Sequence, residues 1–490
     1  MSSPCSTLLP VLSALLALCL LLGLASPASA QAVPDRPNVL FIFADDFAYD
    51  CIAELGNDQI RTPTLDRLVR GGTTFTHAYN MGSYSGAVCI ASRMMLNSGR
   101  FVWTSQKLHR QAEAEREAGR WWSEHLKDAG YETYMTGKWH LHASAQKSFD
   151  HQVHERPGMP RDTKEGYNRP KPDGSDPWDP ADPKFGGFWA GGKHWSEVIA
   201  DDTEAFLEHA SKLPDNKPFF MYIAFNAPHD PRQAPQKYID LYPPDEIKVP
   251  QPFIAQYPYG KAMQCPPGLR DERLAPHPRF EHAVQVNRAE YYAIITHLDD
   301  QLARIMRALD KSGKADNTIV VFTADHGLAV GHHGLMGKQN MYDHSVRVPF
   351  ILKGPGIAAN KRIDAGIYLQ DIMPTTLEWA GLEDKPDHVD FKSLNPLLEN
   401  EYAEHYDAIY GGYQTGQRAI TYEGHKLILY PQVPVARLYD LNNDPLETAD
   451  LAQLPESKPV MKKLFAKLLE LQVAVRDEMD LTAKYPELAR

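Results

Sequence analysis

Acidic and histidine side chains recur in the sequence at places where they could hold a metal ion. Asp45 and Asp46 are adjacent, and Asp325 is followed directly by His326. Carboxylate oxygens are the ligands that hard divalent ions such as calcium and magnesium prefer, and such an ion holds several carboxylates close together. The alternative is that these aspartates cap helices, as Asp commonly does. Because both pairs occupy equivalent places in the predicted elements, we favour a metal site.

A cysteine is the candidate nucleophile. Cys89 follows a loop rich in Gly and Ser, residues 82–86, and lies shortly before Arg93 in a segment that is expected to begin a helix. A cysteine at a helix N-terminus beside an arginine has a lowered thiol pKa and is a plausible nucleophile. Without further context, a lone cysteine is as often an inert, small apolar residue.

The segments that carry these residues follow a repeated pattern of helix and buried strand. Continuous apolar runs at 38–43, 218–225 and 318–323 predict strands that are buried on both faces, and residues 131–136 predict a further extended segment. Caps and apolar stripes at helical spacing predict helices over residues 62–70, 121–129, 198–213 and 291–309, the first of them with Thr62 as its cap.

Candidate site residues follow directly after each of these strands. In chain order they are Asp45 and Asp46, then Lys138 and His140, then His229, then Asp325 and His326. The carboxyl ends of parallel strands share one edge of an open α/β sheet, and ligands bind at that edge. The sequence therefore predicts an α/β protein whose reactive side chains converge on one edge of a central sheet.

Composition favours a large folded body. The chain has 490 residues, of which 43% are hydrophobic and 23% are charged, and its net charge is -12. Such values are near globular averages, and they argue against wholesale disorder and against a polytopic membrane protein. The acidic balance offers no basic field for a nucleic acid backbone, so no nucleic acid partner is expected.

Three regions are expected along the chain. Residues 1–30 contain no charged side chain, and an apolar run at 11–24 ends before small residues at 28–30, which indicates a secretory signal peptide. The run is too short for a bilayer span, so we expect an exported protein, periplasmic or secreted, without a stable membrane span. A catalytic domain is predicted over 31–400, and a smaller α+β subdomain with an antiparallel sheet over 401–490.

A long insertion, at about 156–192, is dense in Pro, Gly, Asp and Trp and has no period. Insertions of this kind are often binding loops, and Trp178, Trp189 and Trp195 would suit an open sugar-binding rim. At its end, Lys193, His194 and Trp195 could contact a sugar through cationic donors and an aromatic face. Packing at the start of a helix is the alternative for these three residues.

Three cysteines remain if the chain is cleaved after Ala30, namely Cys51, Cys89 and Cys265. Three thiols cannot form a disulfide framework. Either Cys51 pairs with Cys265 or all three are reduced, and the sequence leaves both alternatives open.

Taken in order, the motifs resemble those of the type I, formylglycine-dependent sulfatases of the alkaline phosphatase-like superfamily. Cys89 to Arg93, followed by Ser98, Gly99 and Arg100, resembles the modification site of that family, with Ala91 where proline is usual. Further segments resemble motifs of the family and follow one another in the same order, at 44–46, 137–140, 322–327, 337–338, 347–349 and 438–445. The resemblance covers nearly the whole mature chain.

The resemblance implies an alkaline phosphatase-like fold, with a central mixed β-sheet between helices. It also implies that Cys89 is oxidised to formylglycine (3-oxoalanine) by a formylglycine-generating maturation enzyme. One Ca²⁺ ion per chain is implied as the cofactor. The implied ligands of this ion are Asp45, Asp46, Cys89, Asp325 and His326.

The same resemblance implies a role for each remaining candidate. Arg93 and Lys138 would stabilise the formylglycine hydrate, and His140 would accept a proton from it. His229 and Lys338 would hold the sulfate and assist the leaving oxygen.

We therefore predict a sulfatase that hydrolyses sulfate monoesters on a sulfated carbohydrate. One alternative is a phosphonate monoester or phosphodiester hydrolase, which can share the formylglycine and the metal. The other is a carbohydrate-binding protein that kept the fold without turnover.

Overall fold

The computed structural model describes residue 1, residues 33–382 and residues 384–490, so residues 2–30 of the predicted signal peptide lie outside it. Within this part of the chain, nine strands form one mixed sheet, in the order β10-β2-β9-β7-β1-β6-β4-β5, with β8 paired to β2. The strands are β1 (Asn38–Ala44), β2 (Thr73–Tyr79), β4 (Glu132–Lys138), β5 (His151–Arg156), β6 (Phe219–Ala224), β7 (Thr318–Ala324), β8 (Arg347–Val348), β9 (Phe350–Lys353) and β10 (Lys361–Tyr368).

The strands at the centre of this sheet run parallel. β1 pairs with β7 on one side and with β6 on the other, and β6 pairs in turn with β4. Every residue of β1, β6 and β7 is buried, as the continuous apolar runs predicted. In register, Ala44 lies beside Ala324, and Phe43 lies beside Ala224. The carboxyl ends of these strands therefore meet at one edge.

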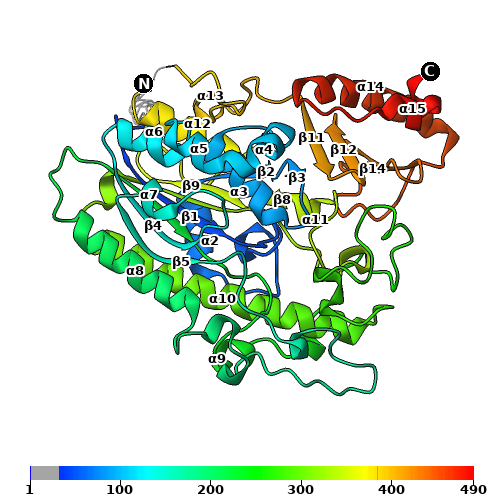
Figure 1. The fold of residues 1–490 in the computed structure, drawn as a ribbon, viewed down its shortest axis with the longest axis horizontal. Helices are drawn as coiled ribbons and strands as arrows, with labels where there is room; N and C mark the ends of the chain where they lie inside the picture. Colours follow the sequence, from blue (N-terminus) through cyan, green and yellow to red (C-terminus); the bar gives the residue numbers. More distant parts are fainter. Residues whose placement is uncertain (2–32, 383) are drawn as a thin grey trace.

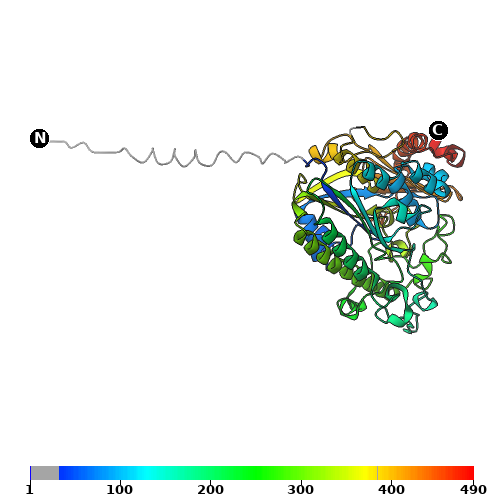
Figure 2. The same cartoon turned by 60° about the vertical axis from the view of Figure 1, so that its left-hand side comes forward.

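Helices cover both faces of the sheet, as Figures 1 and 2 show. On one face, α10 (Glu281–Lys311) packs against α8 (Trp195–Ala210) and α2 (Pro63–Gly71). On the other, α6 (Trp122–Asp128) packs against α3 (Val88–Ser98) and α12 (Ile372–Trp379). The predicted fold class, a central mixed β-sheet between helices, is confirmed.

A second sheet is formed mainly by the C-terminal part of the chain, shown in orange in Figure 1. Its order is β14-β13-β12-β11-β3, and α14 (Lys458–Ala474) packs against it. Its strands are β11 (Ala408–Tyr413), β12 (Gln417–Tyr422), β13 (His425–Tyr430), β14 (Val435–Asp440) and β3 (Gly82–Ser83). The antiparallel C-terminal sheet was predicted. The parallel addition of β3, which lies just before Cys89, was not.

The long insertion is fastened to the body of the protein. Arg169 forms ion pairs with Asp176 of the insertion and with Glu290 of α10, each at 2.6 Å. Trp178, which was expected on an open sugar-binding rim, is only 7% exposed and packs against Phe185. The expectation of an open rim is wrong for this tryptophan, because its ring belongs to the packing of the insertion.

Two further expectations concern membranes and disulfides. Among the residues that the structure describes, no helix has both the length and the apolar character of a membrane span. Cys51, Cys89 and Cys265 are buried free thiols. Cys51 and Cys265 therefore do not form a disulfide, and the alternative in which all three cysteines are reduced is the one that the structure has.

The buried ion pairs of Lys426 predict a large loss of stability on mutation. Lys426 of β13 lies 2.5 Å from Asp343 and 2.7 Å from Glu447, and all three side chains are buried. The change Lys426→Met leaves both carboxylates without this partner, so we expect the free energy of unfolding to fall by about 3–5 kcal/mol in denaturant titrations. Lys463→Met is the control, because its pair with Glu423 is exposed and its loss should change the stability little. Equal, small effects of the two variants would contradict this account.

Candidate active site

The candidate residues meet at the carboxyl edge of the central sheet. Asp45 and Asp46 directly follow β1, and Asp325 directly follows β7. Because β1 and β7 are neighbouring parallel strands in register, these carboxylates lie side by side. Cys89 approaches the same point from the first turn of α3.

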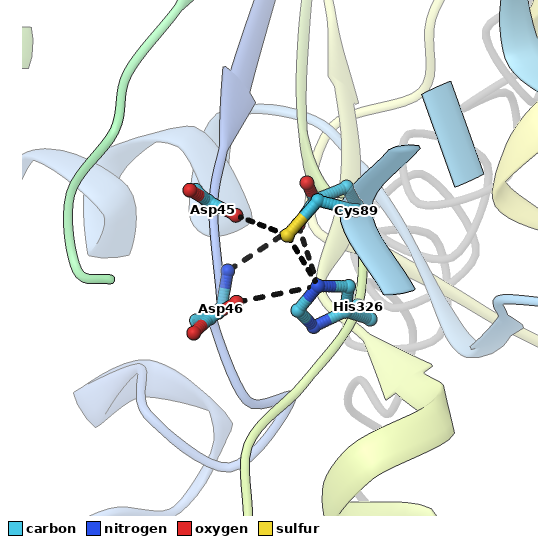
Figure 3. A group of neighbouring side chains, drawn as sticks. Asp45, Asp46, Cys89 and His326 are labelled. Carbon is cyan, nitrogen blue, oxygen red and sulfur yellow. Dashed lines mark hydrogen bonds and ion pairs between the residues drawn. The ribbon is translucent and has the colours of Figure 1, made fainter. Parts of the chain in front are cut away.

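A buried cluster of possible metal ligands occupies this point. Asp45, Asp46, Cys89, Asp325 and His326 each offer one ligand atom, and these atoms all lie within 4.8 Å of one another. Figure 3 shows four of the five side chains turned toward a common centre. The Cys89 Sγ atom lies 3.3 Å from Asp45 Oδ1 and 3.2 Å from His326 Nε2. The structure thus brings together the whole set of ligands predicted from the sequence.

A basic side chain lies beside each of the clustered carboxylates. Lys338 Nζ donates to both oxygens of Asp46, at 2.8 and 2.9 Å. Arg93 Nε donates to Asp325 at 3.1 Å. The three pairs are Lys138 with Asp45, Lys338 with Asp46, and Arg93 with Asp325. Each of these side chains is at most 2% exposed, so water provides little screening.

The electrostatics of the cluster fit a bound cation. Burial, together with the negative charges of Asp325 and Cys89, raises the pKa of Asp45 well above its ordinary value, even though Lys138 opposes this shift. Asp45 therefore still resists ionisation with Lys138 in place, whereas at Asp325 burial is outweighed by the positive charges of His326 and Arg93, so the pKa of Asp325 lies below its ordinary value. A divalent ion held by these oxygens would relieve that repulsion, and the donor set suits a hard ion.

The thiol of Cys89 lies in a strongly electropositive environment. Burial raises its pKa, but Lys138, Lys338 and His326 more than offset this effect, so the pKa of Cys89 lies well below the ordinary thiol value. Burial raises the pKa of Cys51 and of Cys265, and their neighbouring carboxylates add to the shift. Only Cys89 of these three thiols therefore has thiolate character.

Two histidines lie in the same cavity as Cys89, and one of them, His229, has its Nε2 atom 3.8 Å from Asp46 Oδ2. His229 Nδ1 donates to the backbone carbonyl of Asp230 at 2.7 Å, which leaves Nε2 to accept from Lys338 at 3.1 Å. His140 lies beside the Cys89 side chain, and burial lowers its pKa, so it is neutral and able to accept a proton. A Cβ atom on Gly158 would lie 2.5 Å from the His140 ring, so a glycine is required there.

These groups line a cavity of about 450 Å³. Its lining includes Cys89, His140, His229 and Lys338 of the predicted set. The residues that sequence reasoning missed include Met159, Leu269, Arg270, Asp271 and Gln339. Met159 belongs to the predicted insertion, and Asp271 begins a short 3-10 helix (Asp271–Leu274). None of the five has a motif of its own that would mark it. A cavity of about 530 Å³ elsewhere contains none of the predicted site residues.

Lys193, His194 and Trp195 do not line this cavity. His194 is buried and accepts a hydrogen bond from the backbone N–H of Ser196, so it caps α8. Trp195 is only 5% exposed, and the guanidinium of Arg156 covers its ring at 4.5 Å. Packing at the helix start, the alternative considered for these residues, is the arrangement that His194 and Trp195 have, whereas Lys193 is exposed and pairs with Asp201.

Comparisons with known proteins agree with this geometry. The sulfatase family model matches residues 37–382, and the model of the N-sulphoglucosamine sulphohydrolase C-terminal region matches residues 331–474. An arylsulfatase of Clostridium perfringens is 28% identical over 89% of this chain and 95% of its own. An N-acetylglucosamine-6-O-sulfatase of Bacteroides thetaiotaomicron is 26% identical over 97% of this chain and 92% of its own.

A solved structure in complex with its substrate D-glucosamine-2-N,6-O-disulfate superposes with a TM-score of 0.70 at 25% identity, covering 90% of this chain and 99% of that one. The fold, the cluster and the family match together define a hydrolase of the α/β class with an alkaline phosphatase-like fold. The chain belongs to the sulfatase family and is a sulfuric ester hydrolase.

The electropositive environment of Cys89 predicts selective labelling of its thiol in protein that still carries the translated cysteine. Iodoacetamide near neutral pH should modify Cys89 and leave Cys51 and Cys265 unmodified, as measured by peptide mass spectrometry. The change Lys338→Met removes a cation 3.6 Å from the sulfur, so we expect the midpoint of the pH–rate profile of labelling to move to higher pH, by about one unit. Lys193→Met is the control and should keep the midpoint of the unaltered protein. The same midpoint in all three proteins would contradict the assigned environment.

Proposed function

We propose that this protein is an exported sulfatase that removes sulfate from a sulfated carbohydrate, with formylglycine at position 89 and one bound calcium ion. The observation that carries the proposal is the position of Cys89, whose sulfur contacts both the acidic cluster and the cations of the cavity. Two relatives with carbohydrate substrates in their names or titles support the substrate class. Export rests on the sequence of residues 1–30.

Charge balance explains why the reaction calls for a divalent ion. Among the described residues of the cluster, three carboxylates are each paired with one basic side chain. A sulfate ester is itself an anion, and an oxygen nucleophile brings further negative charge toward it. A divalent ion adds the positive charge that offsets this repulsion in the transition state.

Calcium is the ion that best fits the ligands. Asp45, Asp46 and Asp325 provide carboxylate oxygens, and His326 provides one nitrogen. Oxidation of Cys89 to formylglycine exchanges its sulfur for oxygen, so the set becomes rich in hard donors. Calcium accepts such oxygen sets with flexible geometry, whereas zinc sites are built from nitrogen and sulfur more often.

Side chains of the protein accept and donate the protons that move during the reaction. The hydrate of formylglycine supplies two hydroxyl groups, one to attack sulfur and one whose deprotonation allows sulfate to be expelled. His140 is neutral and beside position 89, so it is the base for the second hydroxyl. His229 and Lys338, which contact each other at 3.1 Å, hold the sulfate and assist the departing alcohol oxygen. Arg93 and Lys138 stabilise the nucleophile.

Peptide mass spectrometry tests the nucleophile. Protein co-produced with a formylglycine-generating enzyme should contain an aldehyde at position 89. The change Cys89→Ala should lower sulfate release by at least about a thousandfold, because removing a catalytic nucleophile typically has an effect of that order or larger. Cys265→Ala is the matched control and should retain activity. Unmodified Cys89 in protein from the native host would favour the non-catalytic carbohydrate-binding alternative.

The substrate class is tested with matched esters. We expect release of sulfate from sulfated saccharides, and higher kcat/KM for a sulfate ester than for the equivalent phosphonate monoester or phosphodiester. Activity confined to a small aryl sulfate would count against a carbohydrate substrate. A higher kcat/KM for the phosphonate would instead support the phosphonate hydrolase alternative.

Metal removal tests the assigned ligands. Chelation followed by dialysis should abolish sulfate release, and Ca²⁺ should restore it better than Zn²⁺. Asp325→Asn should weaken calcium binding at least about tenfold in calorimetric titrations, since even residues behind the ligands typically have effects of that size. Asp173→Asn is the control, because this aspartate is exposed and lies in the insertion. Full activity after rigorous metal removal would refute the assignment.

A further inference from the structure

The catalytic cavity extends beyond the groups that surround Cys89, and its outer wall carries a partly exposed cation. Among the described residues that line it, Arg270 has a side chain that is 29% exposed, whereas the side chains of Asp271 and Lys338 are 3% and 2% exposed. The same wall otherwise offers mainly apolar contacts, from Met159 and Leu269. A substrate bound by its sulfate therefore meets Arg270 with a part of the molecule that does not react.

The guanidinium of Arg270 is held in a fixed position. Its Nη1 atom donates to Asp230 at 2.8 Å, and its Nη2 atom donates to Asp271 at 2.5 Å. Asp271 is itself fixed, because Gln339 donates to its other carboxylate oxygen at 2.6 Å. Side chains that are held in place before a ligand arrives lose less entropy on binding. Arg270 is thus built as a pre-positioned donor.

Arg270 keeps donor capacity beside its two carboxylates. Both carboxylates are buried, whereas the guanidinium is partly exposed. A guanidinium has five N–H donors, and Asp230 and Asp271 each take one of them. Nη1 also lies 2.6 Å from the sulfur of Met159, which is a weak acceptor, and Nη2 lies 3.5 Å from His229 Nε2. The bonds to the carboxylates therefore take only part of the donor capacity.

The position of Arg270 sets the distance to the reacting ester. Arg270 Nη2 lies 3.5 Å from His229 Nε2, and His229 is assigned to the sulfate. A group that binds Arg270 therefore belongs to the same sugar unit as the ester, or to the next one. The planar guanidinium fork matches the paired oxygens of a carboxylate or a sulfate.

We propose that Arg270 selects substrates that carry a second anionic substituent, a carboxylate or a further sulfate, beside the ester that is cleaved. This inference rests on the proposed sulfatase function and deepens it, because it defines the substrate as a polyanionic saccharide. Asp230 and Asp271 act as positioning residues that orient Arg270.

Two pairs of probes separate the two possible anions. N-acetyl-D-glucosamine 6-sulfate and D-glucosamine-2-N,6-O-disulfate both lack a free amine and differ by a second sulfate, and sulfated glucose and sulfated glucuronate differ by a carboxylate. For each pair, the measurement is the ratio of the two kcat/KM values within one protein, since a general loss of activity cancels in the ratio. We expect the unaltered protein to prefer the doubly charged member of at least one pair by about 10- to 100-fold.

The variants Arg270→Gln and Arg270→Lys test the residue itself. Arg270→Gln should reduce the ratio at least about tenfold, and Arg270→Lys should retain part of it, because lysine keeps the charge without the fork. Arg304→Gln is a matched control: Arg304 is 27% exposed and also pairs with two carboxylates, Asp201 and Glu204, but it lies outside the catalytic cavity. Its ratio should equal that of the unaltered protein.

The outcomes distinguish this inference from the proposed function. Sulfate release without any preference for a second anion, or with a preference that Arg270→Gln leaves intact, overturns the inference and leaves the sulfatase function standing. Absence of release from every ester contradicts the function. The inference is then decided by thermal unfolding with the same saccharides: the doubly charged members should raise the Tm more than their partners, and Arg270→Gln should remove that difference. Equal Tm shifts overturn it.

Discussion

The burial of three carboxylates at one point is the constraint on which the rest of the structure depends. Removing such charges from water is costly unless cations and hydrogen-bond donors compensate for the loss. In this chain the compensating groups come from separate elements: Arg93 from α3, Lys138 from the end of β4, and Lys338 from the loop after β7. Each ion pair joins segments that are far apart in sequence, so the same contacts that balance the charge also fix the edge of the sheet.

Strands and their ends could be predicted because their burial leaves a direct mark on the sequence. A strand covered on both faces has to be apolar at every position, and the polar residue that follows then marks its end. The start of α2 shows where this reasoning stops. Thr62 was expected to cap it, but Asp299 of α10 accepts from the backbone N–H groups of Thr64 and Leu65, at 2.9 and 2.8 Å. A cap from a distant helix leaves no local pattern.

The insertion and the outer wall of the cavity were harder to predict for a related reason. A loop that packs on the body of the protein can have the same content of Pro, Gly and Trp as a loop that is exposed to solvent. The double ion pair of Arg169 decides between the two arrangements here, and one of its partners, Glu290, lies in α10. Arg270 and Asp271 likewise gain their roles only when the chain brings them next to His229 and Lys338.

The second sheet is part of the active site, although its own strands supply no catalytic side chain. β3 pairs with β11 directly before the loop that leads to Cys89, and this close approach requires glycine, since a Cβ atom on Gly82 would lie 2.0 Å from the Gly412 carbonyl oxygen. Gln417 of β12 donates to the backbone carbonyl of Gln339 at 2.8 Å. The sheet therefore holds both the approach to Cys89 and the residue after Lys338. Because nucleophile and sulfate-binding lysine are each anchored to it, the spacing between them depends on the docking of the C-terminal sheet against the larger one.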